Sequence, residues 1–173
     1  ARHWLDVVRY AESGGYEFDG FRPGAYHYRD WVIKALNDDM PYDEFIRMQL
    51  AGDKLMPGEY AGASATGFLV AGPYPGQITT KTVEKIRYDQ LDDMIMTIGG
   101  SMLGLTLGCV RCHEHKYDPI PHQDYYGIAS SLVHEVGHQG AALLGLVGSL
   151  RADLRRTRRG RGRSSAWDRW DRW

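Results

Sequence analysis

Apolar residues recur along most of the chain at the three- and four-residue intervals of an amphipathic helix. This spacing predicts helices over residues 3–12, 28–36, 40–52, 61–70 and 124–133. A longer helix is expected over about 82–107, where one face carries a regular apolar row made of Leu91, Ile95, Ile98, Met102 and Leu105. No stretch alternates apolar and polar residues as a half-buried strand does. The pattern therefore predicts a mainly α fold.

Glycine and proline clusters separate the predicted helices and indicate long loops. Both residue types occur in the segments 16–25 and 72–76, and Pro119 and Pro121 favour an extended stretch. Glycines in the second half of the longest helix allow either close packing or a bend there. We expect a single irregular helical domain with long loops.

The composition is that of an ordinary soluble globular protein, with 43% apolar and 25% charged residues among 173. This length suits one domain with a hydrophobic core. No run of apolar residues is long enough to predict a membrane span. The two cysteines lie three positions apart, so a framework of disulfides cannot hold the fold.

Charge is distributed unevenly, although the net charge is only -1. Residues 134–173 carry nine arginines, no lysine and four acids, a balance of +5. The preceding residues carry twelve basic and eighteen acidic side chains, a balance of -6. We therefore divide the chain into a helical domain over residues 1–130 and a basic Arg/Trp-rich tail over 131–173. The tail is expected to be disordered or aberrant, and no nucleic-acid partner is expected.

The segment Cys109-Val110-Arg111-Cys112-His113 has the spacing of a c-type haem attachment motif, CxxCH. Two thiols three positions apart can each bond one haem vinyl group, and the adjacent histidine can then ligate the iron. The simpler alternatives are a disulfide or a reduced pair of core cysteines. We expect Cys109 and Cys112 to hold haem c, with His113 as the axial ligand.

Other residues near this motif could also bind a metal ion or the haem iron. Two sulfurs and two imidazoles form a possible zinc set, which comprises Cys109, Cys112, His113 and His115, with His122 or Asp118 as substitutes. Four ligands so close in sequence would strain the chain, so zinc is the alternative and haem the first expectation. The second axial ligand of a haem is left open among Met94, Met96, Met102, His115, His122 and His27.

The segment His134-Glu135-Val136-Gly137-His138 matches the HExxH signature of zinc peptidases. In that signature two histidines bind the metal and the glutamate activates water. No histidine follows that could act as a third ligand. We therefore expect the match to be accidental.

Aromatic and acidic residues near the N-terminus suggest a further alternative, a module that binds or cleaves polysaccharide. The residues are Trp4, Tyr10, Tyr28 and Trp31, with the acids Asp6, Glu12 and Asp30. Aromatic residues at helical spacing more often form the core, and the acids are expected to cap helices or pair with arginines. For the same reason Asp89, Asp92 and Asp93 are expected to form a solvated or arginine-paired face.

Several segments, taken together in this order, resemble one protein family. They are residues 2–13, 28–33, 40–45, 49–53, 65–68, 89–93, 104–120 and 124–126, and they include the whole CxxCH motif. Together they resemble the domain of unknown function 1549 of the planctomycete cytochrome-C-associated proteins, over residues 1 to about 130. The family's motif matches Cys109, Cys112 and His113.

The resemblance implies the middle domain of a large exported protein, here a fragment without the first residues of that domain. Members often carry a cytochrome-c-like domain upstream and another uncharacterised domain downstream, which are then the expected partners. Together with the CxxCH motif it implies an extracytoplasmic location, in the periplasm or cell envelope. The resemblance therefore relates the chain to a family but implies no reaction that the chain would catalyse.

Beyond Ser131 the resemblance stops, and we expect a shifted reading frame there. The family tends to continue with a Ser-Val-Phe-Thr-Lys-like segment. Residues 132–136 can be encoded by codons that give Ser-Phe-Thr-Lys when they are read one base later. The alternative is a genuine disordered basic tail that binds an acidic surface. Resequencing the locus separates the two, because an intact frame through residue 173 contradicts the shift.

Overall fold

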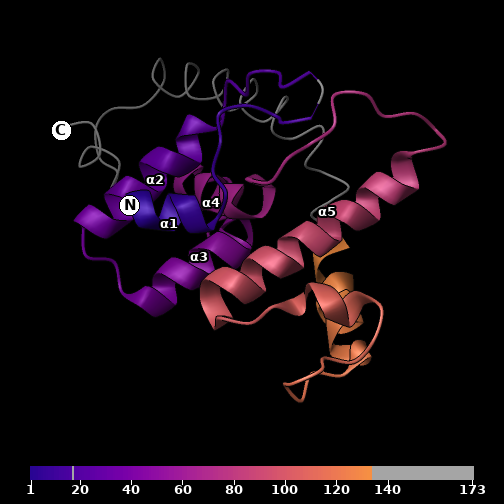
Figure 1. Ribbon diagram of the computed structural model, residues 1–173. Helices are drawn as coiled ribbons and strands as arrows, with labels where there is room; N and C mark the ends of the chain where they lie inside the picture. The colour runs from indigo at the N-terminus through magenta and orange to yellow at the C-terminus, as the bar shows by residue number, and fades with distance from the viewer. Residues whose placement is uncertain (17, 134–173) are drawn as a thin grey trace. The chain divides into compact units, whose positions relative to one another are not determined.

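The computed structural model describes residues 1–16 and 18–133, in which all regular elements are helical (Figure 1). The elements are α1 (Arg2–Val7), α2 (Tyr26–Asn37), α3 (Tyr42–Leu55), α4 (Tyr60–Ala65), the 3₁₀ helix η1 (Thr66–Val70), α5 (Val83–Ile98), the π-helical turn η2 (Gly99–Leu103) and the 3₁₀ helix η3 (Leu107–Arg111). Residues 122–133 are also helical. Within these ranges no helix is both long and apolar enough to cross a membrane. The predicted mainly α fold is confirmed.

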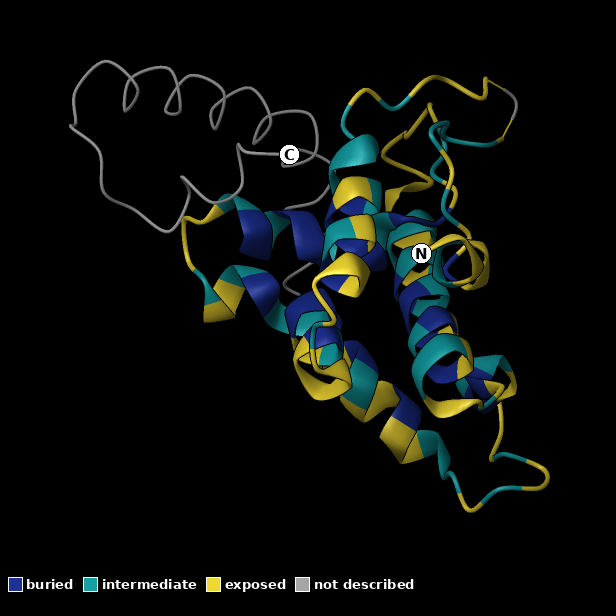
Figure 2. Cartoon of the chain, turned by 90° about the vertical axis from the view of Figure 1, so that its left-hand side faces the viewer, coloured by how far each residue is buried: buried dark blue, intermediate teal, exposed yellow. Residues whose placement is uncertain are grey.

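The first part of the domain is built on α2, α3, α4 and η1, which contact one another. Buried residues lie on the inner faces of these helices (Figure 2). Phe68 of η1 is fully buried, and Trp31 stacks on Phe45 with ring centroids 5.4 Å apart. A Cβ atom on Gly52 would lie 2.6 Å from the carbonyl oxygen of Gly62, so only glycine lets α3 and α4 approach this closely.

A buried glutamine on α3 joins α1 and α2 to this core. The side-chain oxygen of Gln49 accepts hydrogen bonds from the Trp4 indole at 2.9 Å and from the Tyr28 hydroxyl at 2.7 Å. Its amide nitrogen donates to the carbonyl of Phe45 at 3.0 Å. Both polar atoms therefore have partners, which makes the burial of this amide tolerable. Tyr28 and Trp31 are buried and Trp4 is half-buried against them, so these aromatic residues belong to the core, as predicted.

The first helix is shorter than predicted. It ends at Val7 instead of continuing to residue 12, and Arg9 adopts a left-handed φ of 58°. The Arg9 guanidinium pairs with Asp93, at 3.0 Å for one of the two contacts, and with the hydroxyl of Thr97. A contact with α5 thus accompanies the early helix end, and such contacts are invisible to a local pattern.

The longest helix is also shorter than predicted, because α5 ends at Ile98 and a π-helical turn follows. Gly104 then takes a φ of 67°, which favours glycine. At Gly99 the carbonyl accepts the N–H of Leu105 at 2.9 Å, and a Cβ atom would lie 2.7 Å from Leu107. The chain therefore turns back and η3 packs against α5 (Figure 1). The expectation of one helix reaching residue 107 was wrong, since these glycines permit both the bend and the close packing.

Candidate functional site

Cys109 lies on η3, a short helix with three distinct faces, and Cys112 follows the last residue of that helix as its C-cap. A 3₁₀ helix has three residues per turn, so residues i and i+3 share a face. The three pairs are Leu107 with Val110, Gly108 with Arg111, and Cys109 with Cys112. The first pair is buried, the second lies toward α5, and the third is exposed with both thiols free. Two faces therefore anchor the helix, whereas Cys109 and the adjoining Cys112 are both exposed.

The second face of η3 lies directly against α5 at Gly108. A Cβ atom there would lie 2.8 Å from the sulfur of Met96, so a larger residue would push that side chain away. Met96 is itself 42% exposed. Of the other two methionines considered as iron ligands, Met94 is buried in the core and Met102 is half-buried in the π-helical turn. Met96 is thus the one whose sulfur is placed beside the motif.

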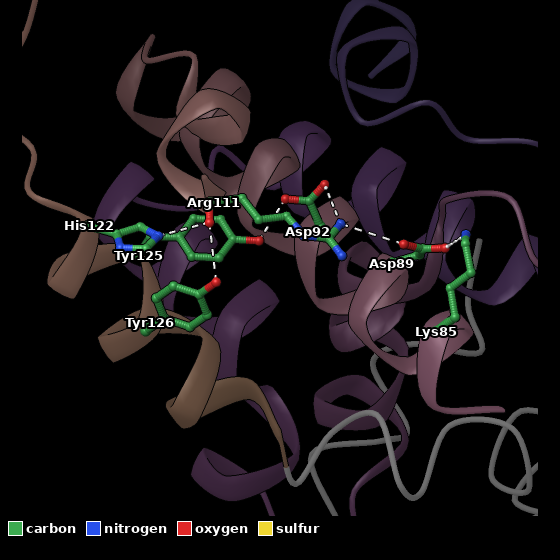
Figure 3. A network of polar contacts seen from close by, with 7 residues as sticks. All are labelled: Lys85, Asp89, Asp92, Arg111, His122, Tyr125 and Tyr126. Atoms are coloured by element: carbon green, nitrogen blue, oxygen red, sulfur yellow. Dashed lines mark hydrogen bonds and ion pairs between the residues drawn. The ribbon is translucent and has the colours of Figure 1, made fainter. Parts of the chain in front are cut away.

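Arg111 extends from the same face toward two acids on α5 (Figure 3). Its Nη1 lies 3.4 Å from a carboxylate oxygen of Asp92 and 3.5 Å from one of Asp89. Lys85 pairs with Asp89 at 2.5 Å, and the hydroxyl of Tyr125 donates to Asp92 at 2.6 Å. The arginine-paired face predicted for these acids is confirmed. It joins Arg111, one of the two residues between the cysteines, to the neighbouring helix.

The backbone of Arg111 is held as well, by the helix over residues 122–133. Its carbonyl accepts hydrogen bonds from Nε2 of His122 at 2.8 Å and from the hydroxyl of Tyr126 at 3.1 Å (Figure 3). The last carbonyls of a helix have no partner within the helix. Arg111 is the last residue of η3, so these two side chains supply the missing donors.

The network shifts the pKa values of its members in the directions expected for paired charges. The hydrogen bond from Lys85 to Asp89, together with the charges of Lys85 and Arg111, lowers the pKa of Asp89 although burial opposes this shift. Burial raises the pKa of the Tyr125 hydroxyl, and its hydrogen bond to Asp92 raises it further. Burial acts to lower the pKa of Arg111, but Asp92, Tyr125 and Asp89 outweigh it and the pKa is raised. The lowered pKa keeps Asp89 ionised at neutral pH, and the raised pKa keeps Tyr125 neutral.

His113 is exposed, and its ring is oriented by the backbone. Nδ1 lies 2.7 Å from the carbonyl oxygen of Glu114. A carbonyl can only accept, so Nδ1 carries the hydrogen and, in the neutral ring, Nε2 carries the lone pair. A histidine that ligates a metal through Nε2 commonly donates its other N–H to a carbonyl in this way.

The other two predicted histidine ligands form hydrogen bonds within the protein. The Nδ1 atom of His115 accepts the backbone N–H of Asp118 at 2.9 Å and contacts the carboxylate of that residue at 3.2 Å, which closes the loop after the motif. Its side chain is only 7% exposed. His122 uses Nε2 for the carbonyl of Arg111. Both histidines thus have structural partners that the sequence pattern did not indicate.

The four-ligand zinc set is not assembled. Among residues 1–16 and 18–133, no group of three or more Cys, His, Asp or Glu side chains is placed to hold a metal ion. This finding covers the set formed by Cys109, Cys112, His113 and His115. The peptidase signature, His134, Glu135 and His138, lies outside the described residues, as does nearly all of the predicted tail.

Two of the three acids of the proposed polysaccharide module, Glu12 and Asp30, are paired with an arginine. Arg29 binds Asp30 at 2.9 Å and also binds Glu12. The hydroxyl of Tyr10 donates to Glu12 at 3.1 Å. Burial and this hydrogen bond raise the pKa of Tyr10 to about 12. This arrangement agrees with the arginine pairing expected from the sequence.

The fold and the motif together define a class: helical domains that present a CxxCH sequence on an exposed turn. The chain belongs to the family described as PSCyt2, protein of unknown function (DUF1549), whose profile matches residues 1–135. This confirms the resemblance seen in the sequence, and the match includes the whole motif. Neither a curated protein nor a solved structure gives a match.

The contribution of Arg111 was missed by sequence reasoning. A signal did exist, because Asp89 and Asp92 are three residues apart on one helix face and the motif contains one cation. The sequence pattern could not predict that the chain turns back after α5 and brings Arg111 next to these two acids. The partners of the Arg111 carbonyl, His122 and Tyr126, depend on the same turn.

Proposed function

We propose that this domain attaches haem c covalently through Cys109 and Cys112, with His113 as an axial ligand, and serves electron transfer. The observation that supports it most strongly is the arrangement of η3. Cys109 and Cys112 are both exposed and carry free thiols, while Leu107 and Val110 are buried and Arg111 pairs with α5. A disulfide-stabilised or reduced core pair would not require this exposure.

The residues present fit such a group. Each free thiol can form one C–S bond with a vinyl group while its hydrogen passes to the other vinyl carbon, so no oxidant is needed. The hydrogen bond from His113 to Glu114 leaves Nε2 of the neutral ring free to act as a ligand. A bound haem would supply a one-electron redox centre. The exposed thioether of Met96 beside Gly108 makes it the methionine best placed for the second axial position.

The proposal includes an extracytoplasmic location and neighbouring redox domains as electron partners. Both are inferred from the motif and from the family, whose description names no activity. Polysaccharide binding is the weaker candidate, because Tyr28 and Trp31 are buried and Arg29 pairs with the nearby acids.

A haem stain after denaturing electrophoresis tests the proposal. The protein is exported in a host that has cytochrome c maturation machinery, alongside the Cys109→Ala/Cys112→Ala variant. The expected result is a stained band for the wild type and none for the variant. A colourless wild-type band from protein with a helical circular-dichroism spectrum would overturn the proposal.

A further inference from the structure

We infer that Arg111 is the positioning residue of the CxxCH motif. Arg111 holds η3 between α5 and the helix over residues 122–133. The inference concerns the geometry of the motif in the protein itself. Its use for cofactor attachment rests on the proposed function above.

The side chain and the backbone of Arg111 bind different elements. The guanidinium lies 3.4 and 3.5 Å from two acids of α5, Asp92 and Asp89. The carbonyl accepts hydrogen bonds from His122 and Tyr126, which lie more than ten residues later in the chain. One residue thus joins η3 to two other helices, to α5 through its side chain and to the helix over residues 122–133 through its carbonyl. Cys109 and Cys112 flank it closely, so any movement of Arg111 moves both thiols.

Tyr125 connects the two sides of this arrangement. It lies on the same helix as His122 and Tyr126, is buried, and donates a hydrogen bond of 2.6 Å to Asp92. Asp92 therefore binds both the guanidinium and the helix that caps the Arg111 carbonyl. Isolated exposed ion pairs contribute little, but a network with a partly buried carboxylate contributes more. The side chain of Asp92 is only 18% exposed.

The geometry also indicates which cationic side chains can replace Arg111 beside Asp89 and Asp92. A single nitrogen, Nη1, faces both carboxylates, so the contact does not use the two-pronged fork of the guanidinium. An ammonium group of similar reach can stand between the two acids. A lysine at this position is therefore expected to restore most of the effect, whereas a neutral residue removes the cation that Asp89 and Asp92 share and leaves them only Lys85 and Tyr125 as partners.

Hydrogen exchange of the segment 107–113 tests the inference without any cofactor. The amide hydrogens of Cys112 and His113 bond to the carbonyl of Cys109 at 3.2 and 3.3 Å, so their exchange reports on the turn. We expect Arg111→Gln to accelerate exchange there by about five- to tenfold, and Arg111→Lys to restore it to within about twofold of the wild type. Arg47→Gln is the matched control, because it breaks an exposed pair with Asp43 on α3 and should leave this segment unchanged.

The possible outcomes separate this inference from the proposed function. Unchanged exchange in a folded Arg111→Gln protein overturns the inference, as does failure of lysine to restore it. If Arg111→Gln does not fold, Asp89→Asn decides, with acceleration of at least about twofold expected and no change overturning the inference. A protein that never takes up haem but shows the expected exchange pattern supports the positioning residue and removes the proposed function. With haem bound, Arg111→Gln should lower the fraction of chains that carry it, and lysine should restore that fraction.

Discussion

Two regions of the described domain are stabilised by different balances of apolar burial and polar contacts. The part made of α1 to η1 rests on buried apolar and aromatic side chains around Phe68, with one fully buried amide from Gln49. The part that carries the motif also buries apolar residues, among them Ile95 and Val110, but η3 is further held there by half-exposed ion pairs and hydrogen bonds around Arg111. Apolar burial tolerates little change, whereas half-exposed polar contacts are individually weak. The motif is therefore held in place by weak local contacts, next to a region whose buried core tolerates little change.

Removing the centre of the apolar core should have the largest effect. Phe68→Ala deletes a fully buried ring, so we expect a loss of about 3–5 kcal/mol in the free energy of unfolding. Denaturant unfolding followed by circular dichroism measures it. Phe21→Ala removes a 72% exposed ring and should cost less than about 0.5 kcal/mol. Equal losses in the two variants would contradict the assignment of the core.

The buried amide should be next in importance. Gln49→Leu leaves the Tyr28 hydroxyl and the Trp4 indole N–H without the amide oxygen that both use, and we expect a loss of about 2–3 kcal/mol in the free energy of unfolding. Tyr28→Phe should cost less in the Gln49→Leu background than in the wild type, because its hydrogen bond to the amide is already lost there. Equal costs in the two backgrounds would show that this hydrogen bond is not the reason for the loss.

A smaller effect is expected where the chain turns back toward the motif. A Cβ atom on Gly99 would lie 2.7 Å from Leu107 and 2.9 Å from the carbonyl oxygen of Leu105. Gly99→Ala should therefore cost about 1–2 kcal/mol and speed hydrogen exchange in residues 105–113. The neighbouring Gly100 has open space around its Cβ position, so Gly100→Ala is the matched control and should change neither quantity. Similar behaviour of the two variants would show that η3 does not pack against α5 here.

The smallest effect is the pH dependence of the polar network. The pKa of Asp89 is lowered in the folded protein, mainly by Lys85, so its contribution is present above the unfolded value of about 4 and is lost as the pH falls. The stability difference between wild type and Asp89→Asn should be measurable at pH 6 and shrink toward pH 3 in denaturant titrations. Asp43→Asn, at the exposed pair with Arg47, should change little at either pH. A difference that grows on acidification would contradict the pairing.

The apolar pattern predicted the elements of the first region well. Helices over residues 28–36 and 40–52 were expected, and α2 and α3 span Tyr26–Asn37 and Tyr42–Leu55. Burial of one helix face produces the periodicity directly, so the sequence contains that information. The predicted helix over 61–70 appears as α4 followed by the 3₁₀ helix η1.

The second region was predicted less completely. The motif was found because its residue types are adjacent in sequence. The anchoring of Arg111 depends on contacts across 11 to 22 residues, between Arg111 and His122 or Asp89, and on the turn at Gly104. Those contacts are polar and leave no periodic trace. For the same reason the sequence offered His122 only as a possible metal ligand and gave no sign that its Nε2 caps η3.

The central claim is covalent attachment of haem c at the exposed face of η3, and the intact mass of the unfolded protein tests it most directly. Protein exported in a host with cytochrome c maturation machinery is compared with Cys109→Ala/Cys112→Ala after complete denaturation. The account predicts one haem mass added to the wild type and none to the variant. A wild-type mass equal to that of the bare polypeptide, from protein that was folded before denaturation, would contradict it.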